Sequence, residues 1–466
     1  MKYISTRGHA EALDFEGVTL AGLAPDGGLY VPESWPRFSA EEIANMAGLP
    51  YAELAVRIMA PFVEGSLTEG ELRELCTQAY GTFAHEAITP LVQLDEQQWL
   101  LELFHGPTLA FKDVALQLLG RLFEHFLSRS DDHLTIVGAT SGDTGSAAID
   151  AVAGRDRIDI FMLHPEGRVS DVQRRQMTTV LSPNVHNIAI DGSFDDAQAM
   201  VKRMFVDAEV TGKYRITAVN SINWARLMAQ VVYYFAAALQ LGAPQRKVAF
   251  SVPTGNFGDV FAGYVAAQMG LPIERLIVAT NINDILHRAL SSGDYSAGTV
   301  TPTAAPSMDI QVSSNFERLL FCEGGRDGAA LAEQMRGFEA SKAMQLTNSQ
   351  REGSAALFTS ARATPGEMTQ AMAYAAEHYG QTIDPHTAIG LHAARAAGID
   401  PSVPVVTLAT AHPAKFPDAV EGATGTVPEL PARVGDLFDR EERYETLPGT
   451  YEAVRDYVVQ CATPSA

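Results

Sequence analysis

The stretch Leu103–Asp113, LFHGPTLAFKD, determines how the rest of the chain is organised. Within it, Gly106-Pro107 ends the apolar, strand-like run Trp99–Leu103. From Lys112 onward, apolar residues recur at three- and four-residue spacings as far as Leu127, which predicts a helix. Lys112 is therefore expected where a loop meets the N-terminus of a helix.

The expected surroundings of Lys112 disfavour a positive charge. The helix dipole and the apolar neighbours both lower the pKa of an amine at this position. A lysine that forms a Schiff base needs such a lowered pKa, so Lys112 is a candidate nucleophile. The alternative is a lysine on a surface helix, which packs its alkyl stem on apolar residues and keeps its ammonium in water.

The composition is that of a large globular protein. With 466 residues the chain has room for about two to four domains. Hydrophobic residues make up 46% and charged residues 19%, which is enough to bury a sizeable core. The formal net charge of -22 disfavours nucleic acid or an anionic membrane as a partner. An anionic substrate would need a local positive pocket.

The cysteines and the N-terminus indicate a cytoplasmic protein. Cys76, Cys322 and Cys461 are far apart in sequence, so neither a disulfide framework nor a metal site is expected. The histidines are scattered and form no metal-ligand cluster. The first residues contain no apolar segment of a signal peptide, and no apolar run is long enough to span a bilayer.

The order of the predicted elements indicates an α/β fold with a mostly helical N-terminal region. Ser39 and Thr68 are each followed by acidic residues and predict two helix starts within residues 1–95. Residues 133–220 alternate strands with helices and predict a small α/β domain with a parallel sheet. The strand candidates of that domain are 134–137, 158–163, 185–190 and 214–219.

The same alternation continues after residue 220. Strand candidates at 247–252, 276–280 and 405–409 predict a larger α/β domain formed by residues 96–132 and 221–430. The small domain is then an insertion between its two parts. Residues 292–311 form a long loop of the kind that often has a function, and 431–466 are expected as a charged extension on the surface.

Two glycine-rich loops have the form of anion-binding sites. Gly255–Asp259, GNFGD, follows a strand candidate and opens a helix, where backbone N–H groups bind a dianionic phosphate. It lacks the Gly-Lys-Ser/Thr ending of a Walker A loop, and an ordinary turn is the alternative. In Gly138–Ser146, GATSGDTGS, hydroxyl groups and amides suit a carboxylate. A second nucleotide-like loop is the alternative there.

These loops belong to an ordered set of segments that resembles the threonine synthase family. The set is Phe111–Asp113, Gly138–Ser146, Pro253–Asp259 and Ala409–Phe416 (ATAHPAKF). The N-terminal segments at 3–8 and 22–32 are also similar to that family, so the likeness covers nearly the whole chain. Threonine synthases are fold-type II enzymes that depend on pyridoxal 5′-phosphate (PLP).

The resemblance implies a role for individual residues. Lys112 would bind PLP covalently, and Thr410 would face its pyridine nitrogen. The residues implied at the 5′-phosphate are Gly255, Asn256, Phe257, Gly258 and Asp259. Those implied at the substrate α-carboxylate are Ser141, Gly142, Asp143 and Thr144, although Asp143 is an unusual neighbour for an anion and would orient the loop instead.

Three further segments are similar to the family. Asn220–Arg226 and Ser313–Arg318 combine amides, hydroxyls and one arginine, which suit a phosphorylated amino acid. Substrate contact is expected at Asn223 and Arg226, with helix caps and exposed arginines as the alternative. The role of Asp384–Ala388 is open.

The implied activity is that of a carbon–oxygen lyase acting on a phosphate ester. It converts O-phospho-L-homoserine and water to L-threonine and phosphate, as a monomer or homodimer, with Lys112 moving the protons. One alternative is a related PLP phospho-lyase or dehydratase that gives 2-oxobutyrate. The other is a nucleotide-binding protein without PLP.

Overall fold

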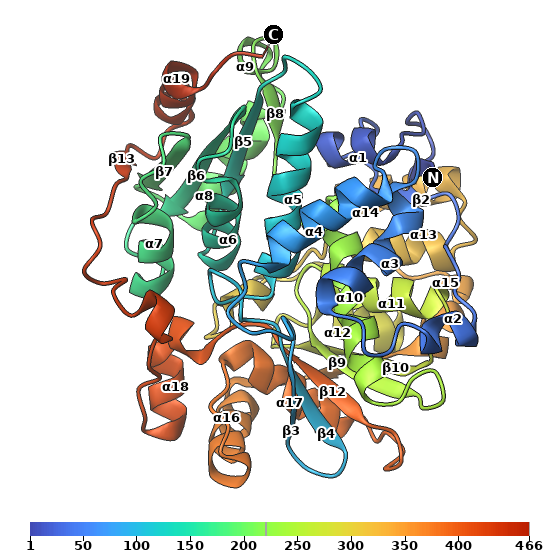
Figure 1. Ribbon diagram of the computed structural model, residues 1–466. Helices are drawn as coiled ribbons and strands as arrows, with labels where there is room; N and C mark the ends of the chain where they lie inside the picture. The colour runs from blue at the N-terminus through green and yellow to red at the C-terminus, as the bar shows by residue number, and fades with distance from the viewer. Residues whose placement is uncertain (220, 466) are drawn as a thin grey trace.

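The structure is a computed structural model that describes residues 1–219 and 221–465. It contains a six-stranded sheet and a five-stranded sheet, both largely parallel and both packed with helices, together with a helical N-terminal region (Figure 1). This arrangement confirms the expected class of two parallel-sheet α/β domains.

The N-terminal region begins with a short antiparallel pair and continues as helices. Its elements are β1 (Tyr3–Ser5), α1 (Phe15–Ala21), β2 (Tyr30–Pro32), α2 (Ala40–Ala44), α3 (Tyr51–Val63) and α4 (Glu69–Tyr80). Ser39 and Thr68 form capping boxes with Glu42 and Glu71, which confirms both predicted helix starts. The sequence pattern does not predict β1 and β2, because three residues are too few to show alternation.

The six-stranded sheet has the order β11-β10-β9-β12-β4-β3. Its strands are β3 (Leu91–Gln93), β4 (Gln98–Glu102), β9 (Val248–Pro253), β10 (Ile273–Thr280), β11 (Phe358–Arg362) and β12 (Val405–Ala409). Every neighbouring pair is parallel except β3 and β4, which form an antiparallel edge.

The helices that accompany this sheet lie before, between and after its strands. They are α5 (Lys112–Leu127), α10 (Trp224–Gln240), α11 (Gly258–Gln268), α12 (Ile285–Ser292), α13 (Phe316–Glu323), α14 (Gly328–Ser341), α15 (Asn348–Leu357), α16 (Pro365–Tyr379), α17 (Pro385–Ala396) and α18 (Pro417–Thr424). Short 3-10 turns occur at η1 (Pro306–Met308), η2 (Pro413–Lys415) and η3 (Ala432–Val434). Of these, α5 is the helix predicted to begin at Lys112.

The five-stranded sheet has the order β13-β7-β6-β5-β8, and all its pairs are parallel. Its strands are β5 (Leu134–Ala139), β6 (Ile158–Pro165), β7 (Val185–Ile190), β8 (Arg215–Thr217) and β13 (Glu445–Leu447). The helices with it are α6 (Asp143–Val152), α7 (Asp171–Thr178), α8 (Phe194–Met204), α9 (Ala208–Thr211) and α19 (Tyr451–Cys461).

The seven strand candidates all correspond to strands, but three strands besides β1 and β2 were not foreseen. They are β3, which pairs with β4 from within residues 1–95, and β11 and β13. Residues 431–466 also differ from a plain surface extension. They return to the five-stranded sheet, where β13 pairs with β7 and α19 buries Val454 and Val458 (Figure 1). A three-residue strand on a sheet edge has no periodicity to detect.

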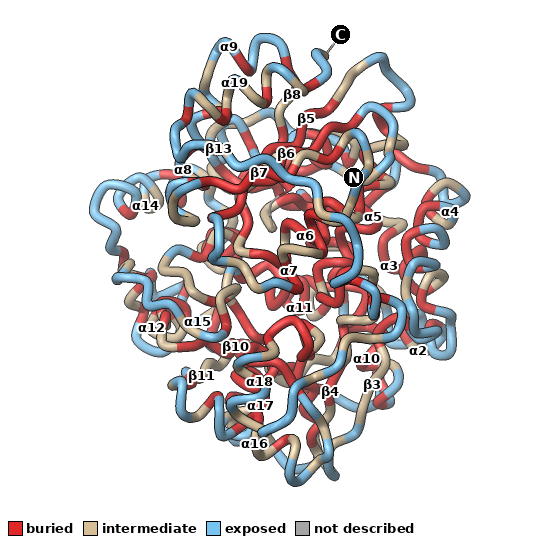
Figure 2. The backbone as a smooth tube through the Cα atoms, turned by 90° about the vertical axis from the view of Figure 1, so that its left-hand side faces the viewer, coloured by how far each residue is buried: buried red, intermediate tan, exposed pale blue. Residues whose placement is uncertain are grey.

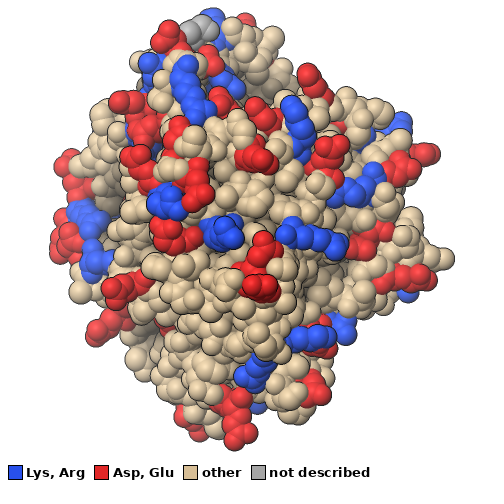
Figure 3. Space-filling view, turned by 45° about the vertical axis from the view of Figure 1, so that its right-hand side comes forward, with Lys and Arg blue, Asp and Glu red and all other residues tan. Residues whose placement is uncertain are grey.

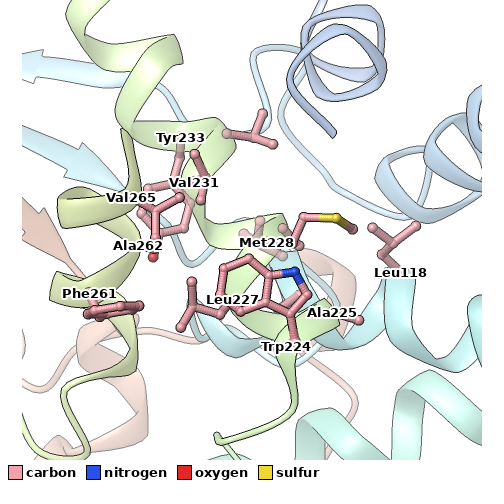
Figure 4. Close-up of a cluster of buried hydrophobic side chains, with 14 of the residues drawn as sticks. Leu118, Trp224, Ala225, Leu227, Met228, Val231, Tyr233, Phe261, Ala262 and Val265 are labelled. Carbon is pink, nitrogen blue, oxygen red and sulfur yellow. The ribbon is translucent and has the colours of Figure 1, made fainter. Parts of the chain in front are cut away.

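The core of the larger unit is built around α10, which is buried along nearly its whole length. Figure 2 shows buried backbone running through the middle of the molecule, with exposed segments around it. Trp224, the first residue of α10, lies among Leu118, Leu227 and Phe261 from three helices (Figure 4). This packing holds α5 and α11 against α10, and both helices begin at predicted site residues.

The parallel strands direct the predicted site residues to one edge of the larger sheet. Lys112 follows β4, Gly255 follows β9 and Thr410 follows β12, and these three strands are adjacent in the sheet. The carboxyl ends of parallel strands lie at the same edge, where open α/β sheets bind ligands. Among the described helices, none is long and apolar enough to cross a membrane.

Gly120 tests the close packing of α5 on α6. A Cβ at this position would lie 2.3 Å from the carbonyl oxygen of Ala151 at the end of α6. We expect Gly120→Ala to destabilise the fold by about 1–3 kcal/mol, because backbone atoms must move apart. Thermal unfolding measures the effect as a lower Tm.

Gly337 on α14 is the matched control, because a Cβ there meets nothing within 4 Å. Gly337→Ala should raise stability by about 0.5–1 kcal/mol through helix propensity alone. An unchanged Tm in Gly120→Ala would show that α5 and α6 are not in tight contact.

Candidate active site

The loop that carries Lys112 is bonded to the segment that carries Thr410. The N–H of Leu103 donates to the carbonyl of Ala409 at 3.0 Å, and that of Phe111 donates to the carbonyl of Thr410 at 2.8 Å. In the other direction, the N–H of His412 donates to the carbonyl of Leu109 at 3.0 Å. The two predicted site segments are thus held together through their backbones.

Lys112 is the first residue of α5 and is buried, with 8% of its surface exposed. Its Nζ lies 3.5 Å from Oδ2 of Asp143 and 3.4 Å from Oγ of Ser307. Burial lowers the pKa of Lys112, Asp143 opposes this effect, and Lys415 and Arg226 lower the pKa further. The expected lowering is confirmed, and the alternative of a surface lysine is wrong.

Asp143 connects Lys112 to a second buried lysine. Its Oδ1 lies 3.1 Å from Nζ of Lys415 and accepts a hydrogen bond from Nε2 of Gln173 at 2.8 Å. Burial would raise the pKa of Asp143, but Lys415 and Lys112 together hold it well below its usual range. The aspartate is therefore ionised and fully occupied by cations and an amide.

The loop Gly255–Asp259 leads into the N-terminus of α11 as predicted. Phe257 takes a left-handed conformation, with φ 62°, and Gly258 begins the helix. Gly255 approaches η1 so closely that a Cβ would lie 2.3 Å from the carbonyl oxygen of Ser307. Asn256 is exposed, and its carbonyl accepts from the N–H of Asn315 at 3.1 Å. Among the described residues, the backbone N–H groups of 255–259 donate to no partner, so the loop can offer them to a ligand.

The side chain of Asp259 does not face the anion loop. Its Oδ1 accepts hydrogen bonds from the hydroxyls of Tyr233 and Tyr234, the latter at 3.0 Å. Burial raises the pKa of Asp259 to about 7, although both tyrosines oppose this. Only the backbone N–H of Asp259 is therefore available to a ligand at the start of α11.

The second loop, Gly138–Ser146, ends in the first turn of α6. Gly142 and Gly145 both donate their N–H to Oγ1 of Thr140 at 2.9 Å. Gly142 has φ 135°, which glycine tolerates best, and the predicted carboxylate-binding residues Ser141 and Thr144 flank it, half-buried. This fold of the loop directs α6, and with it Asp143, toward Lys112.

Asn223 and Arg226 have different surroundings. Asn223 is fully buried and caps α10, with its Nδ2 donating to the carbonyl of Thr19 at 2.9 Å. The side-chain amide of Asn223 therefore stabilises the fold, and the helix-cap alternative is the correct one for this residue. Arg226 is buried, and among the described residues its Nε and Nη1 have no hydrogen-bond partner. Asn220, at the start of the same segment, lies outside the described residues.

Three residues near Lys112 were not foreseen as site residues. Ser307 comes from the long loop 292–311, so this loop reaches Lys112. Lys415 is the last residue but one of the ATAHPAKF segment and is fully buried. His386, from the segment whose role is open, accepts from the N–H of Ser307 through Nε2 at 3.3 Å and contacts Asp384 through Nδ1 at 2.7 Å. For Lys415 and His386, the sequence signal was their position within segments that are similar to the family.

Comparison with known proteins gives the class of this site. The family model described as pyridoxal-phosphate dependent enzyme matches residues 82–366. The chain is thus a PLP-dependent enzyme of fold type II. Models described as threonine synthase N terminus and threonine synthase, C-terminal match residues 2–80 and 387–458. The chain belongs to the threonine synthase family.

Individual threonine synthases are similar to this chain along nearly its full length. The chain is 57% identical over 461 residues to the threonine synthase of Pseudomonas aeruginosa, with coverage of 99% of this chain and 98% of that one. PLP-bound threonine synthase from Brucella melitensis has a TM-score of 0.97 at 52% identity and 99% coverage of both chains. Threonine synthase from yeast has a TM-score of 0.94 at 39% identity, with 99% and 98% coverage.

The residues around Lys112 fit PLP, the cofactor of this family. PLP needs an amine with a lowered pKa and a cradle for a dianionic phosphate. Lys112 provides the amine. The start of α11 provides the N–H groups, next to a glycine at which any Cβ would collide with Ser307. The buried Arg226 guanidinium adds positive charge, since its pKa of about 10 keeps it protonated at neutral pH.

Gly255 tests the phosphate cradle. We expect Gly255→Ala to weaken PLP binding by about tenfold or more, because its Cβ would push η1 away and distort the loop. Titration of the cofactor-free protein with PLP, followed by absorbance, measures the affinity. Gly422→Ala on α18 is the control, since its Cβ meets nothing within 4 Å. Equal affinity of both variants would place the phosphate elsewhere.

Proposed function

We propose that this chain converts O-phospho-L-homoserine and water to L-threonine and phosphate, the last step of threonine biosynthesis. The observation that carries the proposal is that Lys112 contacts Asp143 at the start of α6 and lies near Arg226, whose Nε and Nη1 have no partner among the described residues. Ser307, which also contacts Lys112, lies against Gly255 in the loop before α11. A cofactor phosphate, a substrate carboxylate and a substrate phosphate are three anions that need such donors. The full-length similarity to threonine synthases supports the same reaction.

The cofactor would be held by residues from three loops of the larger sheet. Nζ of Lys112 is the proposed covalent attachment point, and the N–H groups of 255–259 would bind the phosphate. The hydroxyl of Thr410 would face the ring nitrogen, which stays unprotonated more readily beside a hydroxyl than beside a carboxylate. When bound, PLP supplies an electron sink for the negative charge left at the substrate α-carbon.

The substrate would be held at both ends. Ser141, Thr144 and the N–H groups at the start of α6 suit the α-carboxylate, with the carboxylate of Asp143 engaged by Lys415 and Lys112 rather than by ligand. The guanidinium of Arg226 suits the substrate phosphate, because it is buried and can offer two hydrogen bonds at once. The nonreacting groups of the substrate then fix its α-carbon beside Lys112.

Lys112 is the proposed carrier of the protons. Once the substrate has replaced its covalent bond, the free Nζ can take the α-proton, and a proton must also leave the β-carbon. Phosphate departs from the γ-carbon, which receives a proton, and water adds its hydroxyl at the β-carbon. The α-carbon finally regains a proton. The lowered pKa of Lys112 favours the uncharged amine, which can take up a proton from the substrate and later return it.

We also propose that the chain divides into the domains expected from sequence, with residues 133–220 as a small domain inserted between 96–132 and 221–430. Residues 1–95 precede them and give β3 to the sheet of the large domain, whereas residues 431–466 follow and return β13 and α19 to the sheet of the small domain. Substrate would then bridge the small domain at Ser141 and the large one at Arg226. Closure between them would exclude water until the β-carbon is ready to receive it.

A sister reaction that gives 2-oxobutyrate is the alternative. A phospho-lyase would share Lys112 and the anion sites, so product analysis of the purified protein distinguishes threonine from a keto acid. A nucleotide-binding protein without PLP is excluded by membership of the family. The similarity over residues 2–80 favours threonine synthase over a dehydratase.

We place the protein in the cytoplasm as a monomer or homodimer that does not bind nucleic acid. Charge supports the last point, since 34 lysines and arginines stand against 56 aspartates and glutamates. On the face shown in Figure 3, basic side chains stand singly or in small groups among acidic ones and form no continuous basic stripe.

Lys112 is the first test of the proposed function. Borohydride reduction and peptide mapping should find the pyridoxyl label on Lys112. Lys112→Ala should lose at least about a thousandfold in kcat, because the same amine attaches the cofactor and moves protons. A label on another lysine, or a fully active variant, would contradict the assignment.

Arg226 is the second test, and it concerns the substrate phosphate. Arg226→Gln should raise KM for O-phospho-L-homoserine by about tenfold or more, because a charge-assisted bidentate contact is lost. Inhibition by inorganic phosphate should weaken in parallel. The control is Arg246→Gln, an exposed arginine. An unchanged KM together with unchanged phosphate inhibition would place the substrate phosphate elsewhere.

A further inference from the structure

Lys415 is a buried lysine that the proposed reaction does not use. It is 0% exposed, and its Nζ is surrounded by three oxygen acceptors. These are the carbonyl of Thr108 at 2.6 Å, Oε1 of Gln176 at 2.9 Å and Oδ1 of Asp143 at 3.1 Å. The ammonium donates hydrogen bonds to Thr108 and Gln176 and forms an ion pair with Asp143, so its charge is compensated within the buried site. Lys415 therefore holds its positive group in one place.

That charge is next to the one carboxylate in contact with Lys112. The two oxygens of Asp143 face different lysines, with Oδ1 at 3.1 Å from Lys415 and Oδ2 at 3.5 Å from Lys112. Gln173 also donates to Oδ1. The shorter and better-coordinated contact is the one with Lys415, so most of the negative charge of Asp143 is already compensated without Lys112.

The reaction needs Lys112 without its proton. An ammonium cannot bond covalently to a carbonyl group and cannot take up a further proton. An uncompensated carboxylate at 3.5 Å would hold the Lys112 amine in its charged form, because the interaction is barely screened in a buried site. A second cation on the far side of the carboxylate removes this obstacle.

We propose that Lys415 is a positioning residue that engages Asp143 and so leaves the amine of Lys112 free to lose its proton. This inference rests on the proposed role of Lys112. The ion pair also joins η2, beside the larger sheet, to the first turn of α6, beside the smaller one. Lys415 thereby fixes both the place and the effective charge of the group that faces Lys112.

The other charged groups near the pair act in the same sense or are paired with residues other than Lys112. Arg226 from α10 lowers the pKa of Lys112, and His386 from α17 is a further partner of the Asp143 charge. Asp113 on α5 is bonded to Thr108, and burial raises its pKa to about 7. Among the described residues that contact Lys112, Asp143 is the carboxylate and Ser307 the neutral partner.

The experiment measures the proton affinity of Lys112 in the full chain prepared without PLP. Trace labelling with acetic anhydride from pH 6 to pH 11, with peptide mapping of Lys112, gives the pH at which half of the amine is free. Lys415→Met should move this midpoint up by about one pH unit or more, because Asp143 then faces Lys112 alone. Asp143→Asn should move it down, because Lys415 and Arg226 remain.

The double variant and a surface control complete the design. Lys415→Met with Asp143→Asn should return the midpoint toward that of the unaltered chain, since both charges are gone. Lys247→Met removes an exposed lysine paired with Glu274 and should leave the midpoint unchanged. In the PLP-loaded enzyme, the acidic limb of kcat should move to higher pH in Lys415→Met only, because the Lys112 amine is free only once substrate is bound.

Opposite shifts of the labelling midpoint in Lys415→Met and Asp143→Asn support the inference. A general structural disturbance would shift the midpoint in a direction that does not depend on the sign of the charge removed. Shifts in the same direction, or none, overturn the inference. If Lys415→Met does not fold, Asp143→Asn decides, and an unshifted midpoint in that variant overturns the inference. The labelling does not depend on product. A chain that makes no threonine but shows opposite shifts contradicts only the proposed function.

Discussion

The ion pair between Lys415 and Asp143 is the interaction on which the site depends. It is buried, and a buried charge is tolerated only when hydrogen bonds and an opposite charge compensate for lost water. Lys112 and Lys415 both contact this one carboxylate, and Arg226 lies near enough to lower the pKa of Lys112. Because Lys415 satisfies Asp143, the other two remain available, one as an amine with a lowered pKa and one as a guanidinium for an anion. The charges around Lys112 thus already favour an anionic ligand and an uncharged Lys112 amine.

The parallel sheet brings these groups together from distant parts of the chain. The strands β4, β9 and β12 are neighbours, so the loops that follow them meet at one edge although they lie far apart in sequence. Hydrogen bonds between the Lys112 loop and the Thr410 segment keep that edge rigid. The start of α6 approaches from the smaller sheet. A substrate that contacts both must therefore join two units of the fold, which explains why chemistry and closure belong together in the proposed mechanism.

The N-terminal region supports the phosphate-binding loop 255–259 through its contacts with α13. Thr6 and Arg7 both bind Glu317 on α13, at distances of 2.7 and 3.1 Å. The next residue on α13, Arg318, donates to the carbonyl of Tyr30 at 2.9 Å and contacts Asn315. Asn315 in turn donates to the carbonyl beside the anion loop, that of Asn256, at 2.9 Å. A continuous set of buried polar contacts thus runs from β1 and β2 to the start of α11.

The sequence by itself determined the α/β alternation, the two capped helix starts and the loop-to-helix positions of Lys112, Gly255 and Ser141, because these depend on local periodicity and turn chemistry. Similar segments in a fixed order indicated the family, the cofactor and the reaction. The tertiary structure alone decided that Asn223 caps a helix, that Asp259 faces two tyrosines and that Lys415 meets Asp143. The physical reason is that burial and the compensation of charge depend on which distant residues share a low-dielectric interior, and local sequence does not encode that sharing.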